Sequence, residues 1–236
     1  MRAGCALFTD ARPCAGPDPA SGIVCAFSKR ESEVAVPPFT QALIIANVIG
    51  FLLQMSFGAL MLQWLALWPG GGTGLGALPL TAPWQFVTYS LLHGDVFHIL
   101  FNMFAVWMFG SNLERVWGAR RMAFTYVTAV IAGAIAQLLV GAFFTTGNAP
   151  VIGASAGVFG ILLAYALVFP HTRIMLLIPP IPLPARVFVG LYAALELFLG
   201  VTGTQSGVAH FAHLGGLVGG WLGYRYGSSK PGRRGR

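Results

Sequence analysis

A serine flanked by glycines is the first group in this sequence that could do chemistry. Ser155 stands in the run Gly153-Ala154-Ser155-Ala156-Gly157, near the predicted start of a helix. Its hydroxyl is a potential nucleophile, and the first N–H groups of a helix lack acceptors within the helix, so they can stabilise an oxyanion. The same letters occur in the nucleophile elbow of α/β-hydrolases, but that turn follows a β-strand. Small-residue helix packing is the alternative, so this motif alone is weak evidence.

A histidine on a stripe of glycines could supply the base. His213 is followed by Gly216 and Gly220, which fall on its face of a helix. Glycines on one face let another helix backbone approach closely, which would press His213 against a partner helix. His210 competes for the same role but lacks this glycine spacing.

Two polar residues in an earlier apolar run could bind a developing negative charge. His98 and Asn102 are one helical turn apart and share a face. Asp95 is the expected N-cap of their helix. With a rise of about 1.5 Å per residue, Asn102 lies about 9 Å and His213 about 8 Å below the starts of their helices. These depths allow both to meet Ser155 at one level, although hydrogen bonding between helices is the alternative role for His98 and Asn102.

An acidic residue that would complete a catalytic triad is hard to find. Glu196 is the only acid between Ser155 and His213, and no acid follows His213. It lies in a predicted helix, where we expect it to face water or to pair locally. Because geometry decides whether such a group orients a histidine, a Ser–His dyad is the more economical prediction.

The composition indicates the elements that must position these groups. The chain has 236 residues, of which 56% are hydrophobic and 9% charged, whereas a typical soluble domain is roughly 25% charged. This excludes a soluble single domain, a disordered chain and a disulfide-rich secreted chain, and it predicts an all-α polytopic membrane protein. A membrane-spanning helix needs about 20 apolar residues. The predicted spans are about 43–67, 96–113, 122–144, 151–169, 185–199 and 208–226.

The positions of the basic residues predict the orientation of this six-helix bundle. All 14 Lys and Arg residues fall before the first span, between spans two and three, between or at the edges of spans four and five, or from the end of span six onward. The positive-inside rule then places both termini in the cytoplasm. The net charge of +7 is explained in this way, and no nucleic-acid partner is expected.

Three regions follow from these assignments. Residues 1–38 are predicted to form a disordered cytoplasmic tail, 39–227 the six-helix membrane domain and 228–236 a basic cytoplasmic tail. The N-terminal region lacks the pattern of a secretory signal. Its three cysteines match no zinc-binding pattern, so we expect free thiols.

Taken together, the motifs resemble those of the rhomboid family of intramembrane serine proteases, over all six predicted helices. The family's H-x₄-H-x₃-N pattern matches His93, His98 and Asn102, its G-x-S-x-G matches the run around Ser155, and its A-H-x-x-G-x₃-G matches the run around His213. The resemblance implies that Ser155 is the nucleophile and His213 the base. It also implies an oxyanion hole formed by His98, Asn102 and the backbone N–H of Ser155.

The same resemblance assigns residues that support the site. Phe159, one turn after Ser155, is expected to stack on the catalytic imidazole, and Glu114 and Gly118 match a structural E-x₃-G element. Where family members often carry Trp-Arg in the first loop, this chain has Trp84-Gln85, a departure that concerns fold support rather than chemistry. The full supporting set is His93, Gly153, Gly157, Phe159, Gly216 and Gly220.

The resemblance implies an intramembrane serine endopeptidase that cleaves transmembrane segments near the outer face through an acyl-enzyme. It implies that the 68–83 loop lies partly in the outer leaflet, and that the fifth helix and the 201–207 loop act as gate and cap. Expected partners are the lipid bilayer and the transmembrane helices of single-pass or polytopic substrates. No cofactor or metal is expected, because H-E-x-x-H is absent.

Two other functions stay open. One is a catalytically inactive rhomboid-like protein that binds transmembrane helices, although such proteins usually lack the serine or the histidine. The other is a transporter lined by the histidines, although internal repeats are not visible. The expected location is a bacterial inner membrane, since the predicted bundle is compact and carries no targeting segment.

Overall fold

The structure is a computed structural model that describes residues 35–69, 82–144, 149–175, 180–203 and 209–228. The chain divides into two units, Met1–Val36 and Pro37–Arg236. Nearly all of the first unit lies outside the described residues, as does most of the basic C-terminal tail. The predicted tails and the predicted region boundaries therefore stay predictions.

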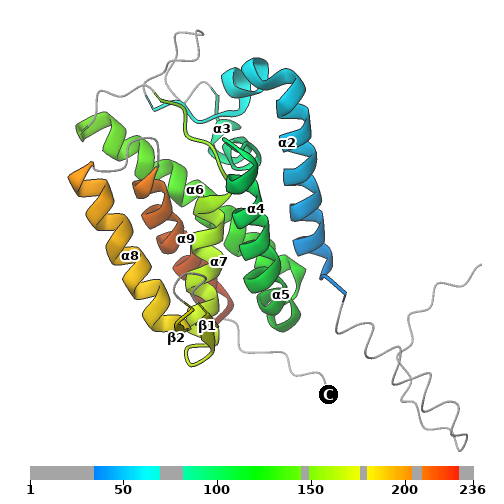
Figure 1. Ribbon diagram of the computed structural model, residues 1–236, viewed down its shortest axis with the longest axis vertical. Helices are drawn as coiled ribbons and strands as arrows, with labels where there is room; N and C mark the ends of the chain where they lie inside the picture. The colour runs from blue at the N-terminus through cyan, green and yellow to red at the C-terminus, as the bar shows by residue number, and fades with distance from the viewer. Residues whose placement is uncertain (1–34, 70–81, 145–148, 176–179, 204–208, 229–236) are drawn as a thin grey trace, which may run out of the picture. The chain divides into compact units, whose positions relative to one another are not determined.

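Helices follow one another in the predicted order (Figure 1). The second predicted span is one continuous stretch made of α4, a π-helical turn (Val106–Gly110) and α5. The principal helices are α2 (Pro38–Leu65), α4 (Val96–Ala105), α5 (Ser111–Trp117), α6 (Ala119–Phe144), α7 (Ser155–Val168), α8 (Ala185–Thr202) and α9 (His210–Ser228).

The first helix begins earlier than predicted, at Pro38 rather than near residue 43. Proline is favoured in the first turn because its missing N–H has no partner there. Glu114 satisfies the next donors, since its carboxylate accepts bonds from the backbone N–H groups of Phe39 at 2.8 Å and Thr40 at 2.7 Å. The cap comes from a residue far along the chain, so the local sequence could not place this start.

The prediction of an all-α polytopic membrane protein is confirmed. Within the described residues, four helical segments are long and apolar enough to cross a membrane: Pro38–Leu65, Val96–Trp117, Ala119–Phe143 and Ala185–Thr202. The apolar helix α7 is shorter, with 14 residues, and the glycine-rich α9 is not among the four. Six crossings and the cytoplasmic position of both termini stay predictions.

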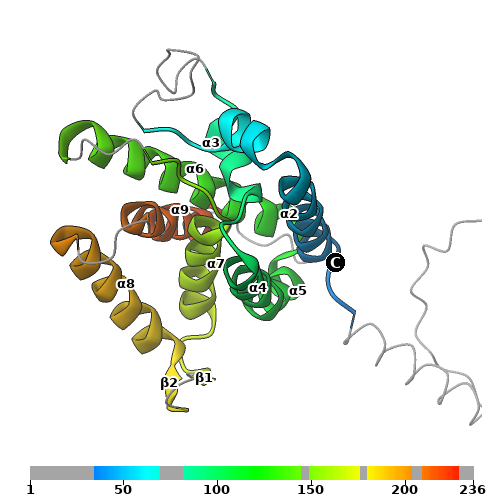
Figure 2. The ribbon, with the colours of Figure 1, turned by 45° about the horizontal axis from the view of Figure 1, so that its top comes forward.

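Helix α7 lies in the middle of the bundle, with α8 on one side and α4 on the other (Figure 2). Ten of its 14 residues are buried, from Ala156 to Ala166. Helix α9 approaches it so closely that a Cβ on Gly216 would collide with the backbone of Ala156, and one on Gly220 with that of Gly160. The glycine stripe thus brings the α9 backbone directly onto α7, as its spacing predicted.

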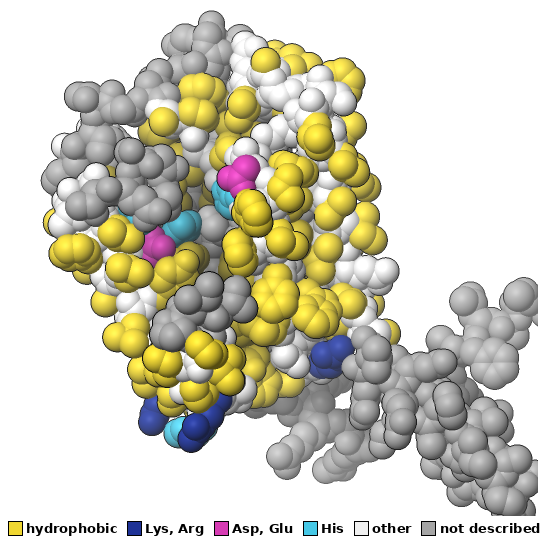
Figure 3. Space-filling model, in the orientation of Figure 1, with side chains coloured by type: hydrophobic (Ala, Val, Ile, Leu, Met, Phe, Trp, Pro, Cys, Tyr) yellow, Lys and Arg dark blue, Asp and Glu magenta, His cyan; other side chains and the backbone are white. Residues whose placement is uncertain are grey.

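Between α7 and α8 the chain forms two short antiparallel strands. Strand β1 (Arg173–Met175) pairs with β2 (Pro182–Pro184), with Arg173 opposite Pro184. On the face shown in Figure 3, hydrophobic side chains predominate, and the visible Lys and Arg side chains gather toward the end that carries these strands. This distribution agrees with basic residues grouped on one side of a membrane.

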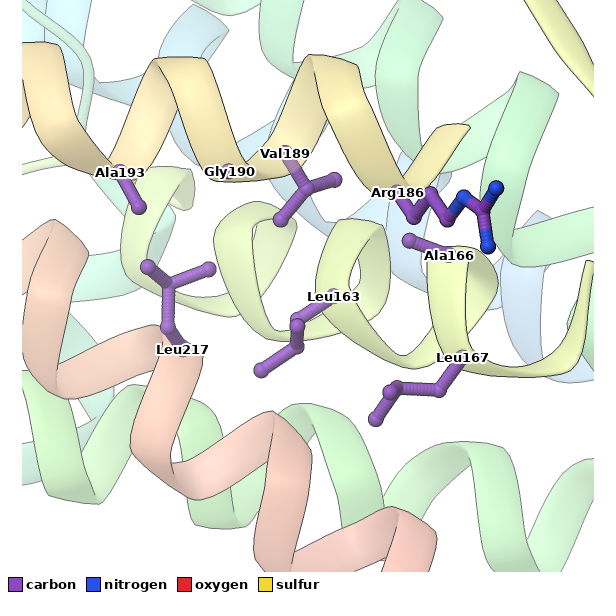
Figure 4. Close-up of a pocket in the computed structure, with 8 residues that line it drawn as sticks. All are labelled: Leu163, Ala166, Leu167, Arg186, Val189, Gly190, Ala193 and Leu217. Atoms are coloured by element: carbon purple, nitrogen blue, oxygen red, sulfur yellow. The ribbon is translucent and has the colours of Figure 1, made fainter. Parts of the chain in front are cut away.

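Helix α8 leaves a cavity of about 240 Å³ against α7 and α9 (Figure 4). Its lining is apolar apart from Arg186 and includes Leu163, Leu217 and Val189. A Cβ on Gly190, which also lines it, would meet no atom within 4 Å. None of the predicted site residues lines this cavity, so it is separate from the candidate active site.

Candidate active site

The backbone before α7 holds Ser155 in a defined place at the start of the helix. Val151 and Leu67 exchange two backbone hydrogen bonds, of 2.8 and 3.1 Å, which tie this segment to the end of α2. The Gly153 N–H donates to the carbonyl of Tyr89 at 3.0 Å. The first N–H groups of α7 have no acceptor within the helix. The bonds to Leu67 and Tyr89 hold the segment before α7, so the Ser155 hydroxyl lies in a fixed position beside these backbone donors.

Ser155 and His213 are brought into direct contact, although 58 residues separate them in the sequence. The Ser155 Oγ lies 2.7 Å from Nε2 of His213. The imidazole stacks on the ring of Phe159, with centroids 4.5 Å apart and planes 8° from parallel. The contact joins a hydroxyl to a base within hydrogen-bond reach, which is the geometry that nucleophilic catalysis needs.

Of the two expectations for Glu196, that it faces water or that it pairs locally, the first is wrong, because the side chain pairs with two histidines of α9. The side chain of Glu196 is buried, and Oε2 lies 2.9 Å from Nδ1 of His213 and 2.7 Å from Nδ1 of His210. The sequence did contain a signal for this, because His210 and His213 are three residues apart and so share a face of α9. His210 is thus bonded to the carboxylate, while His213 contacts Ser155.

His98 lies across from the serine, and its contacts indicate which ring nitrogen carries the proton. The Gly94 N–H donates to Nδ1 at 3.3 Å, so in the neutral ring Nε2 carries the hydrogen. A Cβ built on Gly153 would lie 2.7 Å from that Nε2 and 3.6 Å from Ser155 Oγ. The imidazole of His98 therefore packs directly against Gly153, next to the candidate nucleophile, where any side chain on residue 153 would collide with it.

Asn102 and His93 occupy the expected helix face and the turn before it. Asn102 is buried, and its Nδ2 has no hydrogen-bond partner among the described residues. A buried donor without a partner is uncommon in folded proteins. His93 is buried with its ring edge against His98 at 5.0 Å. Asp95 caps α4 as predicted, accepting a 2.9 Å bond from the N–H of His98.

The other residues singled out in the sequence have structural contacts of their own. Gly157 leaves room for Tyr126, since a Cβ there would collide with its ring. Trp84 and Gln85 both donate to the carbonyl of Trp64, at 2.8 and 3.3 Å, which holds the segment before α3 (Gln85–Thr88) against α2. Most of the 68–83 loop and of the 201–207 loop lies outside the described residues.

The donor atoms of Glu196, His210 and His213 lie within 4.8 Å of one another, a spacing that a metal ion could also use. In this structure the three groups instead bond to each other. The described contacts bring together the hydroxyl of Ser155 on α7, the imidazole of His213 on α9 and the carboxylate of Glu196 on α8, with His98 of α4 packed against Gly153 beside them.

Comparisons with known proteins agree with the motifs and with this fold. The family model described as "Rhomboid domain" matches residues 81–229. The chain is 28% identical over 200 residues to Rhomboid protease GluP of Bacillus subtilis, covering 82% of this chain and 36% of that protein. It is 27% identical over 130 residues to Rhomboid protease GlpG of Enterobacter sp., covering 55% of this chain and 42% of that protein.

Relatives also occur in eukaryotes. Rhomboid protein 1, mitochondrial, of Saccharomyces cerevisiae is 30% identical over 104 residues, covering 44% of this chain and 30% of that protein. The matched region spans about a third of the length of the relatives matched first. Since the family model covers more than half of the sequence and the described residues form the expected apolar helices, this chain is an integral membrane protein of the rhomboid family.

Proposed function

We propose that this protein is an intramembrane serine endopeptidase that cleaves transmembrane segments of membrane-protein substrates. The observation that carries the proposal is the 2.7 Å contact between Ser155 Oγ and His213 Nε2. The rhomboid proteases among the relatives support the same class of reaction.

The reaction begins when Ser155 attacks a backbone carbonyl carbon of the substrate. Its hydroxyl proton passes to Nε2 of His213, and the carbonyl becomes a tetrahedral oxyanion. His213 then gives the proton to the departing amine nitrogen as the C–N bond breaks. The products of this step are an amine fragment and an ester between Ser155 and the other fragment.

Water completes the cycle. His213 takes a proton from a water molecule, which attacks the ester carbonyl and releases the second fragment as a carboxylic acid. The proton returns to Ser155 Oγ, so the enzyme is regenerated. All groups needed belong to the chain itself, and the proposal includes no cofactor.

The donors for the oxyanion are the Nε2–H of His98, the amide of Asn102 and the backbone N–H of Ser155. The packing of His98 Nε2 against Gly153, next to Ser155, supports this assignment. So does the absence of a partner for Asn102 Nδ2 among the described side chains and backbone. Each donor of this kind contributes a factor of about 10²–10³ to kcat.

The substrates we propose are transmembrane helices that unwind near the outer face of the membrane, which in a bacterial cell would be the inner membrane. A helix in lipid has all its backbone groups paired, so a scissile bond must first leave the helix. Small residues and helix ends in the substrate make this step easier.

The experiment is cleavage of a model single-pass substrate by purified protein in liposomes, with Ser155→Ala and His213→Ala beside the wild type. Ser111→Ala is the matched control, because Ser111 is likewise the first residue of a helix, α5, but lies outside the site. We expect cleavage by the wild type and the control, and none by the two site variants. Binding without cleavage would favour a non-catalytic rhomboid-like protein, and histidine-dependent solute flux would favour a transporter.

A further inference from the structure

We propose that Glu196 is a positioning residue that fixes the orientation and the tautomer of His213, and that His210 holds the Glu196 carboxylate in place. This inference rests on the proposed function, since it concerns the base of that reaction. It adds a third and a fourth member to the Ser–His pair, all connected by hydrogen bonds.

The tautomer follows from the chemistry of the carboxylate. An ionised carboxylate only accepts hydrogen bonds, so both histidines must donate to Oε2 from Nδ1. With the hydrogen on Nδ1, Nε2 of neutral His213 carries a lone pair, and that lone pair faces Ser155 Oγ at 2.7 Å. In the other tautomer, Nε2 would donate to the serine and could not take its proton.

The orientation follows from two contacts that restrain different motions. Phe159 lies flat on the imidazole at 4.5 Å and restrains its tilt about the Cβ–Cγ bond, but a ring flipped by 180° about that bond would stack equally well. The 2.9 Å bond from Nδ1 to Glu196 selects one of these two flip states, because the flipped ring would present a carbon to the carboxylate. Together they hold Nε2 toward Ser155.

Charge provides a second contribution. When His213 accepts the serine proton it becomes positive, and the adjacent carboxylate stabilises that charge in a site with little water. The ionisable neighbours of this pair are His210 on α9, Tyr192 on α8 and His98 on α4. Glu196 is therefore the only acidic group that the described residues place against the imidazole.

His210 is placed to keep the carboxylate in its rotamer. Its Nδ1 lies 2.7 Å from the same oxygen, and its ring is buried. A glutamate in a membrane-spanning helix is costly unless it is paired, and two histidine donors meet that need. We expect His210 to act one step further from the chemistry than Glu196.

The test compares Glu196→Gln and Glu196→Asp with the wild type, measuring kcat and KM for the same transmembrane substrate. Glutamine keeps the shape but removes the charge, and we expect kcat to fall on the order of 10²-fold or more with little change in KM. Aspartate keeps the charge but is one methylene too short, so we expect an intermediate kcat. His210→Gln, which retains a donor, should lose less activity than His210→Leu.

Glu114→Gln is the matched control. Glu114 is as buried as Glu196 and also accepts several bonds, but from the start of α2 rather than from the site. This variant should lower the thermal midpoint of unfolding while the folded enzyme keeps its kcat. A fall in kcat for Glu196→Gln that exceeds the fall for Glu114→Gln at equal folded fraction supports a positioning role rather than a structural one.

The outcomes separate the two proposals. If the wild type cleaves through Ser155 and Glu196→Gln retains the wild-type kcat, the positioning role is wrong and the proposed function stands. If wild-type cleavage does not depend on Ser155, the proposed function fails first. If EDTA abolishes wild-type cleavage and Zn²⁺ restores it, the three-residue cluster is a metal site and the positioning role is overturned.

Discussion

Phe159 lies parallel to the imidazole of His213, with the ring centroids 4.5 Å apart. We predict that Phe159→Leu lowers kcat by about 2–10-fold, because an aromatic pair contributes about 0.5–1.5 kcal/mol beyond its buried area. Leucine keeps most of the apolar volume, so KM and the fold should change little. Steady-state cleavage of the model substrate measures the effect.

The control for this variant is Phe169→Leu, at the other end of α7. Phe169 also packs on an aromatic ring, that of Tyr165 at 4.9 Å, which is not one of the predicted site residues. A loss of activity that is equal in the two variants would mean that packing of α7, and not support of the imidazole, explains the effect.

Gly153 is the position where a single methyl group should damage the site most directly. Its φ of +120° is one that residues with a side chain rarely adopt, and a Cβ would lie 2.7 Å from Nε2 of His98. We predict that Gly153→Ala displaces His98 and lowers kcat by about 10²-fold, in line with the loss of one oxyanion donor. The change should also destabilise the fold by about 1–3 kcal/mol through backbone strain.

Gly118→Ala separates these two effects. Gly118 has a φ of +77° at the end of α5, but a Cβ there would meet no atom within 4 Å. It should therefore show the strain without the loss of kcat. If Gly118→Ala reduces kcat as much as Gly153→Ala, the assignment of His98 as an oxyanion donor loses its support.

The fold should lose stability in mild acid because of His93. Burial and the neighbouring His98 lower the pKa of His93 to about 4, from an ordinary value of 6.5. Between these values the unfolded chain binds the proton and the folded one does not, so stability falls as the pH drops from about 6.5 toward 4. The shift corresponds to at most about 3 kcal/mol.

Thermal unfolding of the detergent-solubilised protein between pH 7 and pH 4.5 tests this prediction. His93→Phe keeps a ring but cannot titrate, while Gln54 can still bond the backbone of residue 93. The unfolding midpoint should fall less with acid in the variant than in the wild type. Parallel curves for the two proteins would show that His93 does not carry the effect.

The sequence predicted the contact between Ser155 and His213 because both lie on strongly patterned helices. The apolar runs predicted the helices, and the glycines that follow His213 predicted which face of α9 meets α7. Close approach of two glycine-bearing backbones leaves few ways to arrange the side chains beside them. The order of the motifs along the chain supplied the rest.

Glu196 could not be placed in the same way. A lone glutamate in an apolar helix can face lipid, water or protein, and the rotation of α8 about its axis depends on packing that its own sequence does not specify. The apolar side chains of α8 are mostly exposed and carry little pattern, for example Val201 at 72% and Phe198 at 61%. Similarly, the start of α2 depends on Glu114, a cap supplied from α5.

The measurement that tests the central claim most directly is covalent labelling of the serine. The protein in detergent is treated with a fluorophosphonate probe, digested and mapped by mass spectrometry, beside Ser155→Ala, His213→Ala and Ser111→Ala. We predict one adduct on Ser155 in the wild type and in Ser111→Ala, none in Ser155→Ala, and at least tenfold slower labelling in His213→Ala. Cleavage of the transmembrane substrate without an adduct on Ser155, or labelling of Ser155 at the same rate without His213, would contradict the account.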